Sequence, residues 1–279
     1  MPDPQRRRHL LVWAMRRLPT APSRIVCLTA ETVETLYLLG AGARIAGVSG
    51  YAVRPAEARR KPRVAAFTTA DTGRILELRP DLVLGFSDLQ AEIMRDLVKA
   101  GIEVHVFNQR DIAGILAMIA TLGRLVGAEA KALKLVASLE QRLAASRKRN
   151  AKLKHRPRIY FEEWDEPPIC GIGWVSELIA LAGGEDVFAA RARQGHASAR
   201  MVAPEEIIQA APDIIIGSWC GKKFRPERLV ARPGLGRIPA VQTGQLHEIK
   251  SAIILQPGFG ALTLGLDALE KIIRGWRPV

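Results

Sequence analysis

The chain of 279 residues is poor in cysteine and aromatic side chains, and it has no long apolar run. Its three cysteines (Cys27, Cys170 and Cys220) lack regular spacing, which excludes a disulfide framework and a cysteine-rich zinc knuckle. No apolar run reaches roughly 18 residues, so a membrane-spanning helix is excluded. The signature motifs of zinc proteases, α/β-hydrolases and dinucleotide-binding enzymes are also missing, so catalysis has no positive signal and we predict no enzyme.

Positive charge, by contrast, is abundant, with a net charge of +13 at pH 7. Residues 1–24 and 141–158 carry this whole excess, and the rest of the chain is neutral. A nucleic-acid groove would spread basic side chains over the folded face that binds. We therefore interpret both blocks as solvated surface and expect no nucleic-acid partner, with binding through residues 141–158 kept as an alternative.

The N-terminal residues resemble an export signal only in part. Arg6, Arg7 and Arg8 precede an apolar stretch, but Arg16 and Arg17 soon interrupt it. A secretory signal needs about 7–15 uninterrupted apolar residues. We interpret residues 1–22 as a basic extension and predict a cytoplasmic protein, a location that free cysteines also fit.

Short apolar strands alternate with amphipathic helices in two halves of the chain. This alternation is typical of a parallel sheet with helices on both faces. The halves also resemble each other, because GRILELRPDLVLGFS (73–87) and EEIIQAAPDIIIGSW (205–219) share one pattern. In both, a helix is followed by Pro-Asp, an apolar strand, a glycine and an aromatic residue. The pattern indicates two related lobes.

Residues 129–154 separate the two halves and contain neither Gly nor Pro. They are rich in Ala, Leu, Lys, Arg and Glu, the strongest helix formers, and as one helix they would span about 39 Å. The fold class predicted is therefore α/β, with two parallel-sheet lobes joined by one long rigid helix. The predicted division is a basic extension (1–22), an N-terminal lobe (23–128), a linking helix (129–154) and a C-terminal lobe (155–279).

This arrangement resembles the class III solute-binding proteins of ABC importers, which have a helical backbone and capture metal chelates. The local sequence is most similar to the vitamin B12-binding branch. The similar stretches are RIVCLTAETVETLYLLGAGARIAGVSGYAVRPAEARRKPRV (24–64), RILELRPDLVLGF (74–86), GIEVHVF (101–107) and PEEIIQAAPDIII (204–216). The resemblance implies a corrinoid ligand, cobalamin or a precursor, in the cleft between the lobes. It also implies a periplasmic location as the alternative to the cytoplasmic one.

A corrin ring is large, flat and apolar, so its site needs aromatic walls and a few polar groups. The resemblance carries the N-terminal wall onto Tyr51, Phe67 and Phe86, which follow predicted strand ends, where ligands bind in open α/β sheets. For the C-terminal wall we predict Trp164, Trp174 and Trp219, because the family's tryptophan position is Ala199 here.

The loop SWCGKKFRPE (218–227) completes the predicted site. Its residues Cys220, Gly221 and Lys222 suit an anionic or amide-rich ligand edge. The Lys222 ammonium can also make cation–π contacts with aromatic rings. We predict no metal site, because no histidine or cysteine has a second ligand at suitable spacing. His196 and Cys170 are kept as alternatives for an axial ligand to cobalt or iron.

The resemblance also implies docking on an ABC permease through one acidic residue on each lobe. Glu205 matches the position in the C-terminal lobe, but Gly73 occupies the corresponding position in the N-terminal lobe. With one anchor missing, we expect no productive docking on a B12 permease.

Two alternatives to corrinoid binding stay open. The nearer one is a siderophore-, haem- or metal-chelate-binding protein of an ABC importer. The other is a cytoplasmic enzyme that handles a tetrapyrrole or a metal through Cys170, Cys220 and the acids of residues 162–166.

Overall fold

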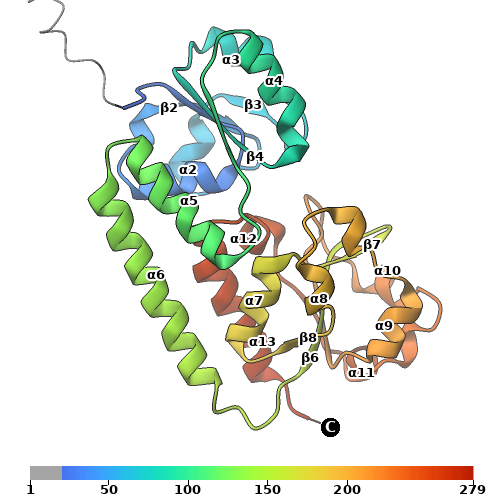
Figure 1. Ribbon diagram of the computed structural model, residues 1–279. Coiled ribbons are helices and arrows are strands. Elements are labelled where there is room, and N and C mark those ends of the chain that lie inside the picture. The colour runs from blue at the N-terminus through green and yellow to red at the C-terminus, as the bar shows by residue number, and fades with distance from the viewer. Residues whose placement is uncertain (1–20, 279) are drawn as a thin grey trace, which may run out of the picture.

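The structure, a computed structural model, describes residues 21–278. The predicted basic extension, residues 1–22, lies almost wholly outside these residues. The described chain forms two sheets of parallel strands flanked by helices, with one long helix along the side of the molecule (Figure 1). This α/β architecture of two lobes is the predicted one.

The N-terminal lobe contains a five-stranded sheet in the order β3-β2-β1-β4-β5, with every pair parallel. Its strand β4 is buried along its whole length, as its unbroken apolar sequence predicts. The elements are β1 (Ile25–Cys27), α2 (Ala30–Leu38), β2 (Ile45–Ser49), β3 (Arg63–Ala65), α3 (Thr72–Glu77), β4 (Leu82–Phe86), α4 (Ala91–Lys99), β5 (Val104–Phe107) and α5 (Ile112–Leu125).

The C-terminal lobe contains the order β10-β9-β6-β7, and β8 also pairs with β6. All of these pairs are parallel except β6 with β7, which form an antiparallel hairpin. The elements are β6 (Arg158–Asp165), β7 (Pro168–Cys170), α7 (Gly173–Ala182), β8 (Glu185–Asp186), α8 (Ala189–Ala192), α9 (Pro204–Ala210), β9 (Ile214–Gly217), α10 (Pro226–Val230), α11 (Pro239–Gln242), β10 (Leu246–Glu248), α12 (Ser251–Ile254) and α13 (Leu266–Gly275).

Helix α6 (Glu129–Asn150) runs from one lobe to the other and packs on α5 and α7. It ends four residues earlier than predicted, since residues 151–154 form a turn. Its buried Leu139 and Leu143 belong to a core cluster that also includes Val33 of α2 and Leu178 of α7. The lobes therefore share one continuous core along α6.

The same arginine–aspartate contacts, called the lock below, lie at the start of the first strand in each sheet. In the N-terminal lobe, Arg24 donates to the carbonyl of Leu78, and Asp81 accepts from the Arg24 amide at 2.9 Å. In the C-terminal lobe, Arg158 donates to the carbonyl of Ala210, and Asp213 accepts from the Arg158 amide at 2.7 Å. Helices α3 and α9 therefore attach to their sheets in the same way. The repeated Pro-Asp pattern of the sequence reflects this shared attachment, because its aspartate accepts the hydrogen bond from the arginine amide.

The segment that follows β10 packs back onto the N-terminal lobe. Arg54 pairs with Glu34 of α2 at 2.8 Å and donates to the carbonyl of Ala252 and to Gln256. A side chain at Gly258 would collide with Glu31 of α2, whose Cβ lies 2.7 Å from the position of the added Cβ. Residues 252–258 thus contact the N-terminal lobe although they follow the last strand of the other lobe.

Candidate functional site

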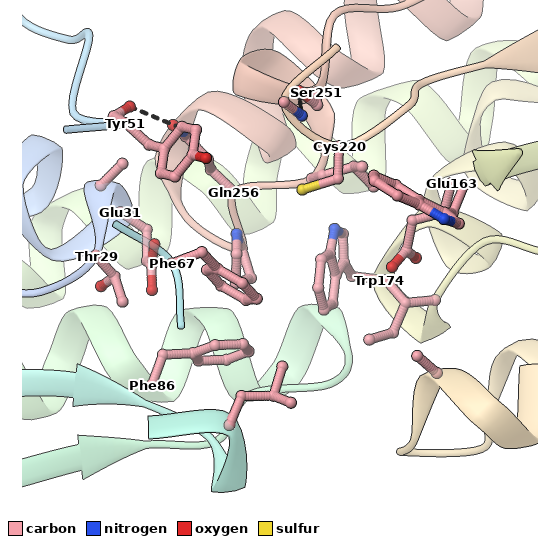
Figure 2. Close-up of a pocket in the computed structure, with 18 of the residues that line it drawn as sticks. Thr29, Glu31, Tyr51, Phe67, Phe86, Glu163, Trp174, Cys220, Ser251 and Gln256 are labelled. Carbon is pink, nitrogen blue, oxygen red and sulfur yellow. Dashed lines mark hydrogen bonds between the residues drawn. The ribbon is translucent and has the colours of Figure 1, made fainter. Parts of the chain in front are cut away.

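A cavity of about 360 Å³ lies between the two lobes, at the carboxyl ends of their strands. Open α/β sheets bind their ligands in this region, just outside the carboxyl ends of the strands. The cavity is lined mainly by apolar and aromatic side chains from both lobes and by residues 251–257 (Figure 2). Such a lining favours a flat apolar ligand with a few polar contacts.

The N-terminal wall carries the three aromatic residues that the sequence predicts there. Tyr51, Phe67 and Phe86 all line the cavity, with exposed fractions of 48%, 37% and 4%. Buried Gln90 holds two of them: its carbonyl accepts from the Phe86 amide at 2.9 Å, and its amide donates to the Phe67 carbonyl at 2.9 Å. Gln90 therefore fixes the strand ends that present these rings.

Nothing in the sequence pattern singled out Gln90. The signal was faint: a polar residue four positions after the strand-end aromatic, at the start of a helix. Gly85 makes room for it, because a Cβ there would lie 3.0 Å from the Gln90 carbonyl oxygen and collide with Met94.

The C-terminal wall contains four of its predicted residues. Trp174, at the start of α7, lines the cavity and donates from its indole to the Ile254 carbonyl at 2.9 Å. Trp164 lines it as well, and the Lys222 ammonium lies 3.8 Å from its ring centroid. Cys220 lies across the cavity from Tyr51 (Figure 2), and Gly221 completes this wall. A Cβ on Gly221 would lie 3.7 Å from the Tyr51 hydroxyl, so this glycine sits close to the opposite lobe.

Trp219 is not a wall of the cavity, and its prediction as one is wrong. Only 1% of it is exposed, and its ring packs edge-on against Phe224 with centroids 5.1 Å apart. The cause is Glu162, a fully buried carboxylate that needs donors and receives the Trp219 indole N–H at 2.9 Å. Arg232 pairs with the same carboxylate.

Two further predicted residues also lie off the cavity lining. The Lys222 ammonium is bound to Asp165, so it supports Trp164 from behind rather than facing the cavity. Cys170 is 1% exposed in β7, and burial raises the pKa of its thiol to about 12, which does not suit a metal ligand.

His196 does line the cavity, at its rim. Its Nδ1 lies 3.5 Å from Asp88, which also pairs with Arg110 at 3.2 Å, so a histidine of the C-terminal lobe meets an ion pair of the N-terminal lobe there. Across residues 21–278, no group of three or more His, Cys, Asp or Glu side chains is placed to hold a metal ion.

Sequence reasoning named the acids of residues 162–166 but missed Arg200 and Glu31, which also line the cavity. Glu163 pairs with Arg200 at 2.6 Å, and Arg200 is 2% exposed. Glu31, in the first turn of α2, is 3% exposed, and burial raises the pKa of its carboxyl to about 7. The sequence signal that could have pointed to Glu31 is its position: an acidic residue soon after an apolar strand, flanked by threonines.

Comparison with known proteins identifies the family. The family model described as periplasmic binding protein matches residues 25–253, most of the chain. The chain belongs to the periplasmic binding protein family. A curated relative, the vitamin B12-binding protein of Vibrio cholerae, is 25% identical over 265 residues, which cover 91% of this chain and 89% of the relative.

Solved structures of the family share the fold. The periplasmic haem-binding protein of Roseiflexus superposes with a TM-score of 0.77 at 23% identity, covering 90% of this chain and 99% of that one. The periplasmic vitamin B12-binding protein of Vibrio cholerae superposes with a TM-score of 0.73 at 22% identity, covering 92% and 98%. As a member of the periplasmic binding protein family, the chain is a solute-binding protein and not an enzyme.

The same comparisons correct the predicted location. The expectation of a cytoplasmic protein is wrong, because the family and its solved members are periplasmic binding proteins. Free cysteines were a poor guide, since two of the three thiols, Cys27 and Cys170, are buried in the cores of the lobes. Between residues 21 and 278, none of the helices has the length and apolarity that crossing a membrane requires.

Proposed function

We propose that this solute-binding protein captures a corrinoid, cobalamin or a precursor, in the cavity between its lobes. The observation that carries the proposal is the pairing of aromatic walls: Phe67 and Phe86 from one lobe face Trp174 from the other (Figure 2). Flat rings bind between such walls through stacking and burial of apolar area. Relatives named for vitamin B12 binding, matched over most of the chain, support this ligand.

Haem is the second candidate, and specific observations favour it. Haem-binding proteins are among the solved structures of this fold. The cavity also contains Tyr51, His196 and Cys220, each of a type that can serve as an axial ligand to iron.

A visible-absorption titration separates the two candidates. Purified protein is titrated with cyanocobalamin, with dicyanocobinamide and with haem, and calorimetry gives the stoichiometry. We expect saturable one-to-one binding of a corrinoid that is tighter than binding of haem. Failure of both corrinoids to bind at micromolar protein would refute the corrinoid proposal.

We further propose that Glu205 is a docking contact of the family kept on the C-terminal lobe, and that this single anchor does not give productive docking on a B12 permease. This residue is exposed at the start of α9, where its carboxylate is available to a basic partner. Gly73 takes the equivalent place in α3, because both residues directly follow the first residue of their helix. In this proposal the N-terminal lobe spans residues 23–128 and the C-terminal lobe spans residues 155–279.

A further inference from the structure

Tyr51 is the least enclosed of the three aromatic residues on the N-terminal wall. It lies in the turn after β2, and 48% of it is exposed, whereas Phe86 in β4 is buried. Ordering a mobile side chain at a binding site costs binding free energy. A half-exposed ring therefore adds most to affinity when contacts in the free protein already hold its backbone in place.

The contact that holds Tyr51 comes from the segment that follows β10. The side-chain amide of Gln256 donates to the Tyr51 carbonyl at 3.1 Å (Figure 2). The oxygen of the same side chain accepts from Nη2 of Arg54 at 3.2 Å. An arginine only donates, so it keeps the amide oxygen of Gln256 on its own side and leaves the amide nitrogen for Tyr51.

Arg54 stands behind this wall and does not line the cavity itself. Its Nε pairs with Glu34 of α2 at 2.8 Å, and its Nη1 donates to the Ala252 carbonyl at 2.6 Å. Gly260 leaves room for the guanidinium, because an added Cβ there would collide with Nη2. One planar side chain, fixed to the N-terminal lobe, thus holds the segment that carries Gln256.

We infer that Arg54 is a positioning residue for ligand binding, which acts through Gln256 to hold Tyr51 as a wall of the cavity. This role rests on the proposed function, because it requires a flat ring to bind against Tyr51. Lysine cannot take over the role, since a single ammonium lacks the fork that reaches Glu34 and Gln256 at once.

The first measurement is the affinity of Arg54→Lys for dicyanocobinamide, by absorption titration. The variant keeps the positive charge beside Glu34 but loses the fork, so we expect binding to weaken roughly tenfold, the effect of one hydrogen bond to a charged group. Arg59→Lys is the matched control. It makes the same change five residues further along, where the arginine donates to the Val53 carbonyl outside the cavity lining, and it should leave the affinity unchanged.

A double-mutant cycle with Tyr51→Ala distinguishes positioning from a general loss of packing. Once the ring is removed, Arg54→Lys should change the affinity by less than about twofold, because the group that it positions is gone. A general loss of packing would weaken binding by the same factor with or without the ring. Thermal unfolding verifies that each variant is folded.

Gly260→Ala provides a second way to displace the guanidinium while Arg54 stays in the sequence. The backbone of Gly260 is helical, with φ −61° and ψ −38°, so alanine fits the chain there and its Cβ pushes on Nη2. We expect the same loss of affinity, and the same dependence on Tyr51, as in Arg54→Lys.

The outcomes separate this role from the proposed function. Unchanged affinity in both Arg54→Lys and Gly260→Ala overturns the inference, although corrinoid binding would stand. Equal losses with and without the Tyr51 ring overturn it as well. If dicyanocobinamide does not bind the unmodified protein at all, the corrinoid proposal fails and the positioning role falls with it.

Discussion

The two lobes are built on one frame but present different chemistry to the cavity. Each sheet begins with the same lock, in which an arginine reaches the end of a helix and an aspartate accepts from that arginine's amide. The N-terminal lobe presents the rings of Phe67 and Phe86 at its strand ends, held by the neutral amide of Gln90. The C-terminal lobe instead places acids at the end of β6.

These acids decide which aromatic residues reach the cavity. Buried Glu162 draws Trp219 into the core through a hydrogen bond, while Glu163, one residue further along, faces the cavity and pairs with Arg200. A repeated backbone therefore does not repeat the positions of its aromatic side chains. The polar group beside each strand end determines whether the ring lines the site or supports it from behind.

The largest effect is expected from removing the buried acid of the C-terminal lobe. Glu162→Ala would leave Arg232 without its partner and Tyr160 and Trp219 without an acceptor. Removing one member of a buried ion pair costs about 3–5 kcal/mol of unfolding free energy. Urea unfolding measures the loss, with Glu166→Ala, an exposed acid of the turn that follows β6, as the control. A loss as small as the control's would contradict the supporting role of Glu162.

The buried acid of the N-terminal lobe should behave in the opposite way. Burial raises the folded-state pKa of Glu31 from 4.5 to about 7. Its stabilising contribution is therefore full below about pH 4.5 and is lost as the pH rises through about 7. Glu31→Gln should be the more stable protein at about pH 8, by roughly 2–3 kcal/mol, and the gap should shrink toward pH 5.

Unfolding of both proteins by urea at the two pH values provides the measurement. A stability difference that does not change with pH would show that Glu31 is not the group that titrates. Glu57→Gln removes the same charge at an exposed position outside the cavity lining; it serves as the control and should show no such difference.

Ligand binding should distinguish the aromatic residues of the two lobes. Phe86→Ala removes a ring that lines the cavity, so cobinamide binding should weaken by about 1–3 kcal/mol, a typical value for ring stacking. Trp219→Ala should mainly lower stability, because that ring is buried against Phe224. Calorimetry on the folded variants decides between them. If Trp219→Ala weakened binding more than Phe86→Ala did, the assignment of walls would be reversed.

The smallest effect is expected on permease docking. Gly73→Glu restores an acid opposite Glu205, and its Cβ would fit, lying 3.6 Å from the Asp71 carboxylate. One exposed ion pair adds at most about 1 kcal/mol, so docking should tighten only a few-fold. The measurement is binding to a reconstituted B12 permease, with Glu205→Gln as the weakening counterpart. Tight docking of the unmodified protein that Gly73→Glu does not alter would make the missing acid irrelevant.

The sequence predicts the frame well because periodicity encodes it. The apolar run of β4, the Pro-Asp pattern and the Gly-free helix α6 each have a local cause, and each is present in the structure. Tyr51, Phe67 and Phe86 could be placed at the cavity because the resemblance to the family carries its aromatic positions onto them, and strand ends of a parallel sheet meet at one edge.

The missed residues depend on contacts between segments distant in the sequence. Trp219 pairs with an acid 57 residues away, and Gln90 reaches across 23 residues to Phe67. No local pattern announces such hydrogen bonds. The burial of Glu31 likewise depends on Gly258, which comes from the far end of the chain and packs on its Cβ.

The most direct test of the central claim is X-ray anomalous scattering at the cobalt edge from crystals grown with cobinamide. A corrinoid held between the lobes predicts one cobalt peak in the cavity, between Phe86 of the N-terminal wall and Trp174 of the C-terminal wall. A cobalt peak outside this cavity, in crystals that contain bound cobinamide, would contradict the account.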